Sequence, residues 1–200
     1  MNDTYKTIIK VSKGFYKNKG SKFFSFAFPV ENESRIKDIL TNLKKEHHSA
    51  RHHCYGWRLG TEKITFRAND DGEPSSTAGK PILGQLKSFD ITNSMVVVVR
   101  YFGGILLGTG GLIHAYKTAA ADALNNAEII TKTIQYNYKL GFTYNEMGEV
   151  MQIINQENLN IVNTWFEEQC RLEFSVRKSK SEETERIFNN LYGVDISRIL

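Results

Sequence analysis

An acidic loop carries the first group of side chains that could do chemistry. Asp70, Asp71 and Glu73 fall within four residues, and three hydroxyl side chains and Lys80 follow them. Clustered carboxylates supply the oxygen ligands that a hard cation such as Mg²⁺ prefers. A helix is predicted to begin near Lys80, and the free amides of a helix start attract phosphate. The alternative is a solvent-exposed turn, because Asp, Gly, Pro and Ser are common turn residues.

A glycine-rich segment follows the most apolar run of the chain. It begins after Arg100 and Tyr101 and lacks the lysine of a P-loop and the last glycine of a dinucleotide-binding motif. A glycine-rich turn between a strand and a helix still lets backbone amides approach a phosphate. The alternative is that the glycines only permit close packing. The predicted anion-binding residues are Arg100, Tyr101, Gly103, Gly104, Gly110, Gly111, Lys80 and His52.

Four of the five histidines lie at positions 47, 48, 52 and 53, directly before Cys54. Zinc binding and a Cys–His nucleophile are the two chemistries such a cluster suggests. No HExxH motif is present and no second cysteine is near, so we assign no metal to this cluster. His114 follows the glycine-rich segment and is a further candidate to reach an anion there.

Alternating and helical apolar patterns predict the elements that position these loops. In residues 1–128 they predict strands at 24–28, 55–59, 64–66 and 95–99, and helices at 36–43, after Pro81 and at 112–124. The run Met95–Val99 is continuous, as expected of a strand buried on both faces. Asn32 or Ser34 is available as the N-cap of the first helix.

The second part of the chain alternates more regularly. Its pattern predicts strands at 134–142, 161–166, 170–176 and 194–196, with helices between them. Thr143 with Glu146 and Ser179 with Glu182 have the spacing of capping boxes. The order β-α-β-β-α-β predicts a ferredoxin-like domain at 129–200, after a first domain at 1–128.

Composition and charge narrow the function classes. The chain has 200 residues, 12% aromatic residues and a net charge of +4, with +6 in residues 1–128 and −2 in residues 129–200. The basic first part favours a polyanionic partner such as RNA. The longest wholly apolar stretch is five residues, too short for a membrane helix, and the N-terminus has no apolar signal core. Two cysteines suit a reducing compartment, so we expect a cytoplasmic protein.

Four motifs resemble the YigZ/IMPACT family. They are KGSKF (19–23), ARHHCYGWRLG (50–60), DDGEPSSTAGKPIL (70–83) and VVVVRYFGGILLGTGGLIHAY (96–116). The resemblance implies an α+β protein of two domains. The first would have a βαβ fold like the second domain of small-subunit ribosomal protein five. The second would be ferredoxin-like, as in elongation factor G.

The resemblance also implies a link to translation. Eukaryotic relatives regulate translation through an additional N-terminal domain that the four motifs do not include, so their mechanism does not transfer. This sequence has Ser76 where the family usually has Gly, Leu106 where it has Lys, and His114 where it has Arg. The last two differences remove positive charge near the glycine-rich segment, and Lys80, Arg100, Lys117 and Arg51 would compensate only if they converge.

Together these features predict a regulatory or binding protein rather than an enzyme. We expect it to contact RNA, the ribosome or a translation factor through the loops of residues 1–128. The alternative is an enzyme or binder of a small phosphorylated or nucleotide ligand, with Mg²⁺ held by Asp70, Asp71 and Glu73. A protein–protein adaptor anchored by Phe102 is a third hypothesis.

Overall fold

In the computed structural model, which describes residues 3–199, the apolar run Met95–Val99 lies in the middle strand of a five-stranded sheet. The strands in sheet order are β2 (Ser12–Asn18), β3 (Ser21–Pro29), β6 (Ser94–Tyr101), β4 (His52–Leu59) and β5 (Thr65–Asn69). Both β3 and β4 pair antiparallel with β6, so they run parallel to each other. The chain passes from β3 to β4 through α1 (Glu33–Glu46), which gives the predicted βαβ arrangement.

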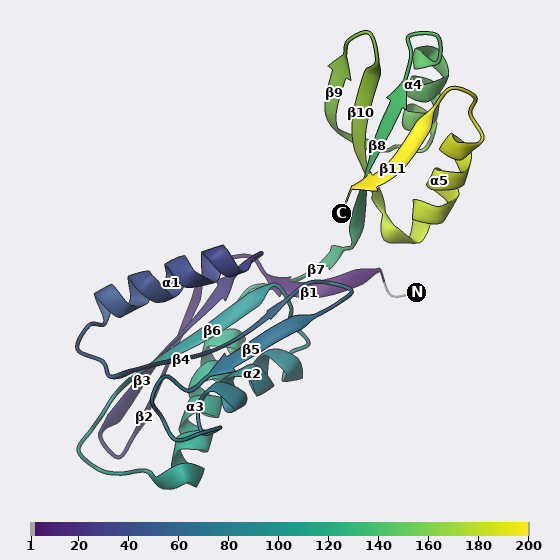
Figure 1. The fold of residues 1–200 in the computed structure, drawn as a ribbon. Helices are drawn as coiled ribbons and strands as arrows, with labels where there is room; N and C mark the ends of the chain where they lie inside the picture. The colour runs from purple at the N-terminus through teal and green to yellow at the C-terminus, as the bar shows by residue number, and fades with distance from the viewer. Residues whose placement is uncertain (1–2, 200) are drawn as a thin grey trace. The chain divides into compact units, whose positions relative to one another are not determined.

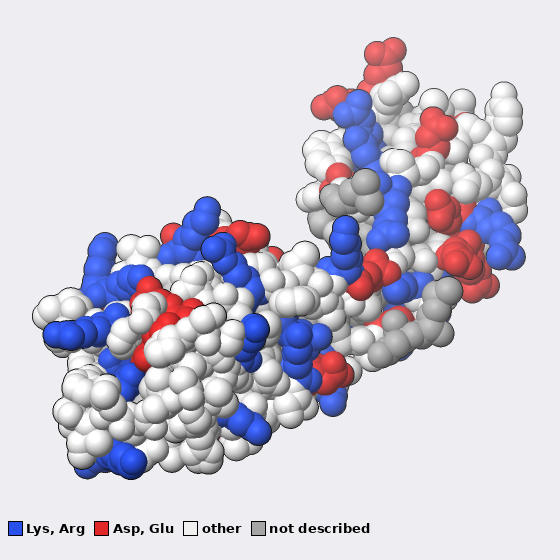
Figure 2. All heavy atoms as spheres, turned by 60° about the horizontal axis from the view of Figure 1, so that its bottom comes forward, with Lys and Arg blue, Asp and Glu red and all other residues white. Residues whose placement is uncertain are grey.

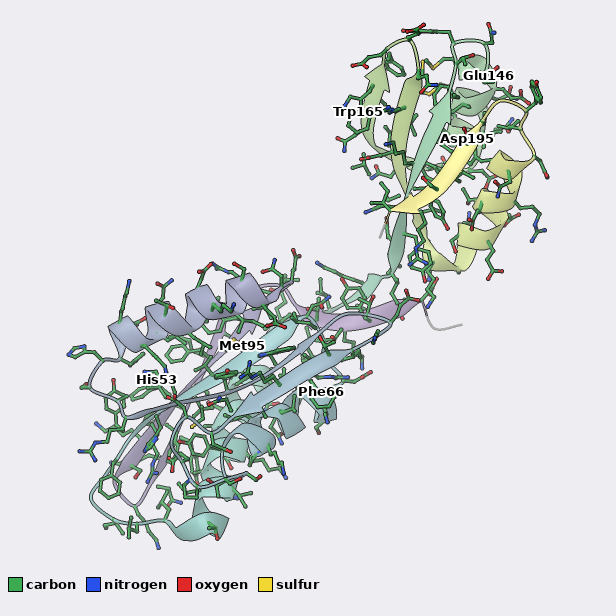
Figure 3. The ribbon with its side chains drawn as sticks, viewed as in Figure 1. His53, Phe66, Met95, Glu146, Trp165 and Asp195 are labelled. Carbon is green, nitrogen blue, oxygen red and sulfur yellow. The ribbon has the colours of Figure 1, made fainter. Side chains whose placement is uncertain are left out.

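Helices cover both faces of this sheet (Figure 1). Helix α1 packs on one face, where Met95, Val97 and Val99 point, and Figure 3 labels Met95. Helices α2 (Gly79–Ser88) and α3 (Gly108–Asn125) pack on the other, where Val96 and Val98 point. Side chains alternate between the faces of a strand, so a strand covered on both sides needs a continuous apolar run.

Local signals explain where α1 and α3 begin. The Asn32 side chain caps α1 by accepting a hydrogen bond from the Arg35 amide at 2.9 Å. Helix α3 begins at Gly108, not at Leu112 as predicted, so Gly110 and Gly111 lie in its first turn. The backbone at Gly108 has φ +70°, a value that favours glycine, and this residue makes the bend into the helix.

Three strands were absent from the sequence-based prediction. They are β2 and the pair β1 (Thr4–Ile8) and β7 (Ile129–Thr133), which form a separate two-stranded sheet. Lysines and glycine break the alternation in β2. Strands β1 and β7 are five residues each and lie far apart in sequence, so no local pattern marks their pairing.

The rest of the chain builds a four-stranded antiparallel sheet. Its strands in sheet order are β11 (Asp195–Ile199), β8 (Gln135–Phe142), β10 (Cys170–Arg177) and β9 (Asn160–Phe166). Helices α4 (Met147–Gln156) and α5 (Ser181–Asn189) share its apolar core, which includes Leu140, Phe174 and Phe188. This arrangement confirms the predicted βαββαβ order and, with the first sheet, an α+β chain of two domains.

The two predicted capping boxes differ in outcome. Glu146 Oε2 accepts a hydrogen bond from the Thr143 amide at 2.9 Å, as a capping box requires, although α4 begins only at Met147. The Ser179 box is wrong, because Ser179 lies in a short 3₁₀ helix, η1 (Lys178–Lys180), and α5 begins after it.

The chain divides into two units by its internal contacts. A larger unit spans Tyr5–Lys132, and a smaller unit spans residues 133–199 with residues 3–4. The division into domains at residues 1–128 and 129–200 stays a prediction, and residues 1–2 and 200 of those ranges lie outside the described part. No helix within residues 3–199 is both long and apolar enough to cross a membrane.

Candidate functional site

The predicted site residues gather at one end of the five-stranded sheet. Because β6 runs antiparallel to both neighbours, its last residues lie beside the first residues of β3 and β4. Arg100 is paired with Phe23 on one side and with His52 on the other. The acidic loop and helix α3 meet at this same end, since Glu73 contacts Arg100 and Tyr116 of α3.

A buried network forms the base of the site. Arg100 Nη1 donates to Glu73 Oε1 at 2.6 Å, and the Tyr116 hydroxyl donates to the same oxygen at 2.7 Å. Arg100 and Glu73 have only 6% and 3% of their side chains exposed. Arg100 Nη2 also lies 3.4 Å from Ser21 Oγ. A buried charge is tolerated only when it is paired and hydrogen-bonded, and each charge here meets that condition.

One atom of this network lacks a partner. The Nε of Arg100 is buried and makes no hydrogen bond within the described residues. Burial raises the pKa of Tyr116, so its hydroxyl stays protonated and keeps donating to Glu73.

The first carboxylate of the acidic loop holds the loop itself. Asp70 accepts hydrogen bonds from the amides of Ser76, Ala78 and Gly79 at 2.9, 3.0 and 2.8 Å. Desolvation opposes the charged form of Asp70, but these three donors outweigh it and lower its pKa. The carboxylate therefore ties the loop to the beginning of α2.

The second carboxylate, that of Asp71, contacts β4 and α1. Asp71 Oδ2 accepts from the His53 amide at 2.7 Å, and Asp71 Oδ1 lies 3.2 Å from Lys44 Nζ of α1. The three carboxylates thus turn to three different sets of partners. No group of three or more His, Cys, Asp or Glu within residues 3–199 is arranged to hold a metal. The residues Asp70, Asp71 and Glu73 do not fit a shared cation, and we derive no metal chemistry from them.

The side chains of His52 and Cys54 contact the acidic loop. His52 Nδ1 is 2.9 Å from the Asp71 carbonyl oxygen, and Cys54 Sγ donates to the Asp70 carbonyl at 2.9 Å. His53, labelled in Figure 3, lies between His52 and Cys54 on β4, so its side chain points to the other face of the sheet. It is 4% exposed, and burial lowers its pKa. Burial raises the pKa of the Cys54 thiol, so it is not the thiolate that a Cys–His nucleophile needs.

The predicted anion-binding glycines have different roles. The Gly103 amide donates to Ser21 Oγ at 3.2 Å, and a Cβ on Gly103 would lie 1.9 Å from the backbone of Gly20. Gly103 is therefore required by the close approach of two chain segments. Gly104, Gly110 and Gly111 have no backbone so near, and the last two belong to the first turn of α3.

Two cavities flank this end of the sheet, one on each face. The cavity on the α3 face, about 440 Å³, is lined by His52, Glu73 and Arg100 together with the start of α3. The cavity on the α1 face, about 510 Å³, is lined by Tyr101, whose hydroxyl bonds His47 Nδ1 at 2.9 Å. Phe102 lines both cavities.

The structure thus places the predicted site residues on both faces of the sheet. Arg100 and His52 share the α3-face cavity, whereas Tyr101 belongs to the opposite face because it is the next residue along β6. Lys80 is exposed in the first turn of α2 and lines neither cavity. Sequence analysis missed Ser21 as a site residue. It also missed the hydrogen bond of Tyr116, because the helical spacing of Tyr116 predicted only a buried position.

Comparison with known sequences supports the resemblance. The family model described as "Impact N-terminal domain" matches residues 19–124. An "IMPACT family member" of Haemophilus influenzae is 34% identical over 175 residues, which cover 84% of this chain and 85% of that protein. The "IMPACT family member YigZ" of Escherichia coli is 34% identical over 169 residues, 82% of each chain.

A solved structure extends the match to the whole chain. It is titled "Crystal structure of an hypothetical protein", is 29% identical, has a TM-score of 0.75, and is matched over 100% of this chain and 99% of its own. The family match covers more than half of the chain and includes Arg100, Glu73 and Tyr116. The chain described here therefore belongs to the IMPACT family.

Proposed function

We propose that this chain is a translation-associated binding protein whose larger unit contacts RNA, free or within the ribosome. The observation that carries the proposal is the gathering of unpaired positive charge at the end of the sheet that holds the Arg100–Glu73 pair. Family membership supports the link to translation, because the resemblance implies that eukaryotic relatives regulate it.

Four exposed cations define this surface, which we call the basic end. Lys17 and Lys22 are paired across β2 and β3, Lys19 lies in the turn between them, and Arg51 precedes β4. None of the four forms an ion pair with a described residue. Neighbouring strands lie about 4.8 Å apart, so the charges extend over about 15 Å from β2 to β4.

The acidic loop at the same end does not cancel this charge. Glu73 is paired with Arg100 and Asp71 with Lys44, and Asp70 accepts hydrogen bonds from three backbone amides, so none of the three carboxylates pairs with a cation of the basic end. Figure 2 shows Lys and Arg side chains around a small acidic group on the larger unit. A surface of this kind suits the phosphates of a polynucleotide, each of which adds one negative charge.

The alternative of an Mg²⁺-dependent enzyme finds less support. Such a mechanism needs carboxylates with free oxygens facing one point. Asp70 instead binds three backbone amides, and Glu73 binds Arg100 and Tyr116. These contacts favour a binding surface shaped by the loop over a catalytic metal site.

The proposal is tested by measuring affinity for a single-stranded RNA between 50 and 200 mM salt. Each phosphate contact on a single strand contributes about 0.7 to the slope of log affinity against log salt. The double variant Lys17→Ala/Lys22→Ala should weaken binding and reduce the slope by about 1.4.

The matched control is Lys37→Ala/Lys63→Ala. Lys37 lies near the beginning of α1, and Lys63 lies in the β4–β5 turn at the opposite end of the sheet. This control should bind like the wild type. Wild-type protein without salt-dependent affinity for RNA or ribosomes would overturn the proposal, and so would equal losses in both double variants.

A further inference from the structure

We propose that the cavity on the α3 face binds one nucleoside 5′-monophosphate, either as a free nucleotide or as the 5′-phosphorylated end of an RNA. Binding of an RNA end rests on the proposed function, whereas binding of a free nucleotide does not. The cavity measures about 440 Å³, within the usual range for small-ligand sites.

One wall of the cavity is apolar and exposed. Phe102 is 52% exposed and Leu106 is 82% exposed, and Leu107 and Leu112 continue the wall. Exposed apolar side chains grouped at a cavity mark a binding surface. The half-exposed ring of Phe102 offers a flat surface on which a nucleobase can stack.

The helix start that lines this cavity suits an anion. Gly108 and Thr109, the first residues of the 18-residue helix α3, line it. No side chain caps this helix start, and no acidic residue stands in its first turn, so its amides have no side-chain acceptor. Free amides and the helix dipole favour a phosphate at this position. Arg51, exposed at the cavity wall, adds a positive charge.

A buried, incompletely bonded side chain points to a ligand independently of the helix start. Arg100 lines the cavity with only 6% of its side chain exposed, and its Nε has no partner within the described residues. Glu73 and His52 line the same cavity and add polar atoms to its lining. A base with a hydrogen-bonding edge and an attached phosphate matches this combination of apolar, polar and anion-binding groups.

The test uses adenosine and uridine 5′-monophosphates as probes, with inorganic phosphate as a partial ligand, and a ten-nucleotide RNA with or without a 5′-phosphate. Wild-type protein should bind a mononucleotide more tightly than phosphate alone. Phe102→Ala should weaken mononucleotide binding about tenfold or more, because it removes the stacking surface. Leu106→Asp should also weaken it by placing a carboxylate near the phosphate.

Phe66→Ala is the matched control, because Phe66 is 56% exposed and lies on the edge strand β5, outside the cavity lining. It should leave mononucleotide affinity unchanged. The thermal midpoint of Phe102→Ala should stay near that of the wild type, since the side chain is half exposed. A loss of binding in Phe66→Ala equal to that in Phe102→Ala would contradict the assignment to this cavity.

The outcomes separate this inference from the proposed function. A 5′-phosphate that tightens RNA binding in the wild type, but not in Phe102→Ala, would support the RNA end as the ligand. Mononucleotide binding without any RNA binding would support the cavity and refute the proposed function. Salt-dependent RNA binding that ignores the 5′-phosphate and Phe102, with no mononucleotide binding, would overturn the inference and leave the proposed function standing.

Discussion

The two units of this chain bury their ion pairs to different extents. The five-stranded sheet carries helices on both faces and buries both members of the Arg100–Glu73 pair at its end. The four-stranded sheet shares one apolar core with its helices, and the ion pair of the smaller unit joins Arg177, 49% exposed, to Asp3, 10% exposed. Burying a charge pair is costly, and an apolar pair often serves stability equally well. The larger unit is therefore the one in which buried polar groups point to function.

The largest effect should come from breaking the buried pair. Arg100→Met leaves Glu73 buried without its cation, so we expect the free energy of unfolding of the larger unit to fall by about 3–5 kcal/mol. The measurement is urea unfolding followed by the fluorescence of Trp57, which is in the larger unit. A Trp165→Phe background removes the other tryptophan.

Two further variants sharpen this contrast. Arg177→Met in the smaller unit should cost less, because Arg177 is half exposed and the Asp3 carboxylate that it leaves, 10% exposed, is less buried than Glu73 at 3%. The double variant Arg100→Met/Glu73→Leu should recover much of the loss, since no unpaired charge remains buried. Equal losses in Arg100→Met and Arg177→Met would contradict the distinction between the two units.

The next effect concerns the acidic loop. Asp70→Asn keeps the shape but removes the charge that three amides bond, and we expect a loss of about 2–3 kcal/mol. The folded-state pKa of Asp70 lies below its ordinary value of 3.8, so its contribution is present above that pH. It is lost as the pH falls through the lower folded-state value.

Urea unfolding at pH 7 and at acidic pH measures both parts of this prediction. Asp38→Asn, an exposed carboxylate on α1, is the control and should change little. If Asp70→Asn is as stable as Asp38→Asn, the loop does not depend on the carboxylate.

A smaller effect should appear near neutral pH. Burial lowers the pKa of His53 below 6.5 in the folded chain, so the unfolded chain takes up a proton first as the pH falls. The free energy of unfolding should therefore decrease as the pH drops through 6.5, until the folded-state pKa is reached. His53→Gln should reduce this slope, and His48→Gln, at an exposed position, should keep it. Identical slopes in wild type and His53→Gln would refute the assignment.

The smallest effect is expected on the open edge of the smaller unit. All residues of β9 are exposed, and Trp165, labelled in Figure 3, is 42% exposed. Trp165→Thr should change the free energy of unfolding by less than about 0.5 kcal/mol and leave RNA affinity unchanged. A marked loss of RNA affinity in this variant would move the binding surface to the smaller unit.

Regular patterns predicted much of the fold, and the failures have physical reasons. The run at 95–99 predicted a strand buried on both faces, and the alternation at 134–142 predicted β8, because burial sets the spacing of apolar residues. Strands β1 and β7 escaped prediction because their pairing depends on a distant partner, not on a local period.

The candidate site was predictable only in part. Arg100 stood out as a charge at the end of an apolar run, but its partner Glu73 was grouped with Asp70 and Asp71 as a cation ligand. Sequence proximity suggested that the three carboxylates act together, whereas the turn of the loop sends them to separate partners. Tyr116 was placed in the core by its helical spacing, and nothing in that spacing shows what its hydroxyl bonds.

The most direct test of the account is amide hydrogen exchange with and without bound RNA, read along both units at low salt. The account predicts slower exchange at residues 17–22, around Arg51 and at 102–109, with no change in β9. Protection confined to the smaller unit, or no protection at the basic end while RNA is bound, would contradict the claim that the larger unit is the binding surface.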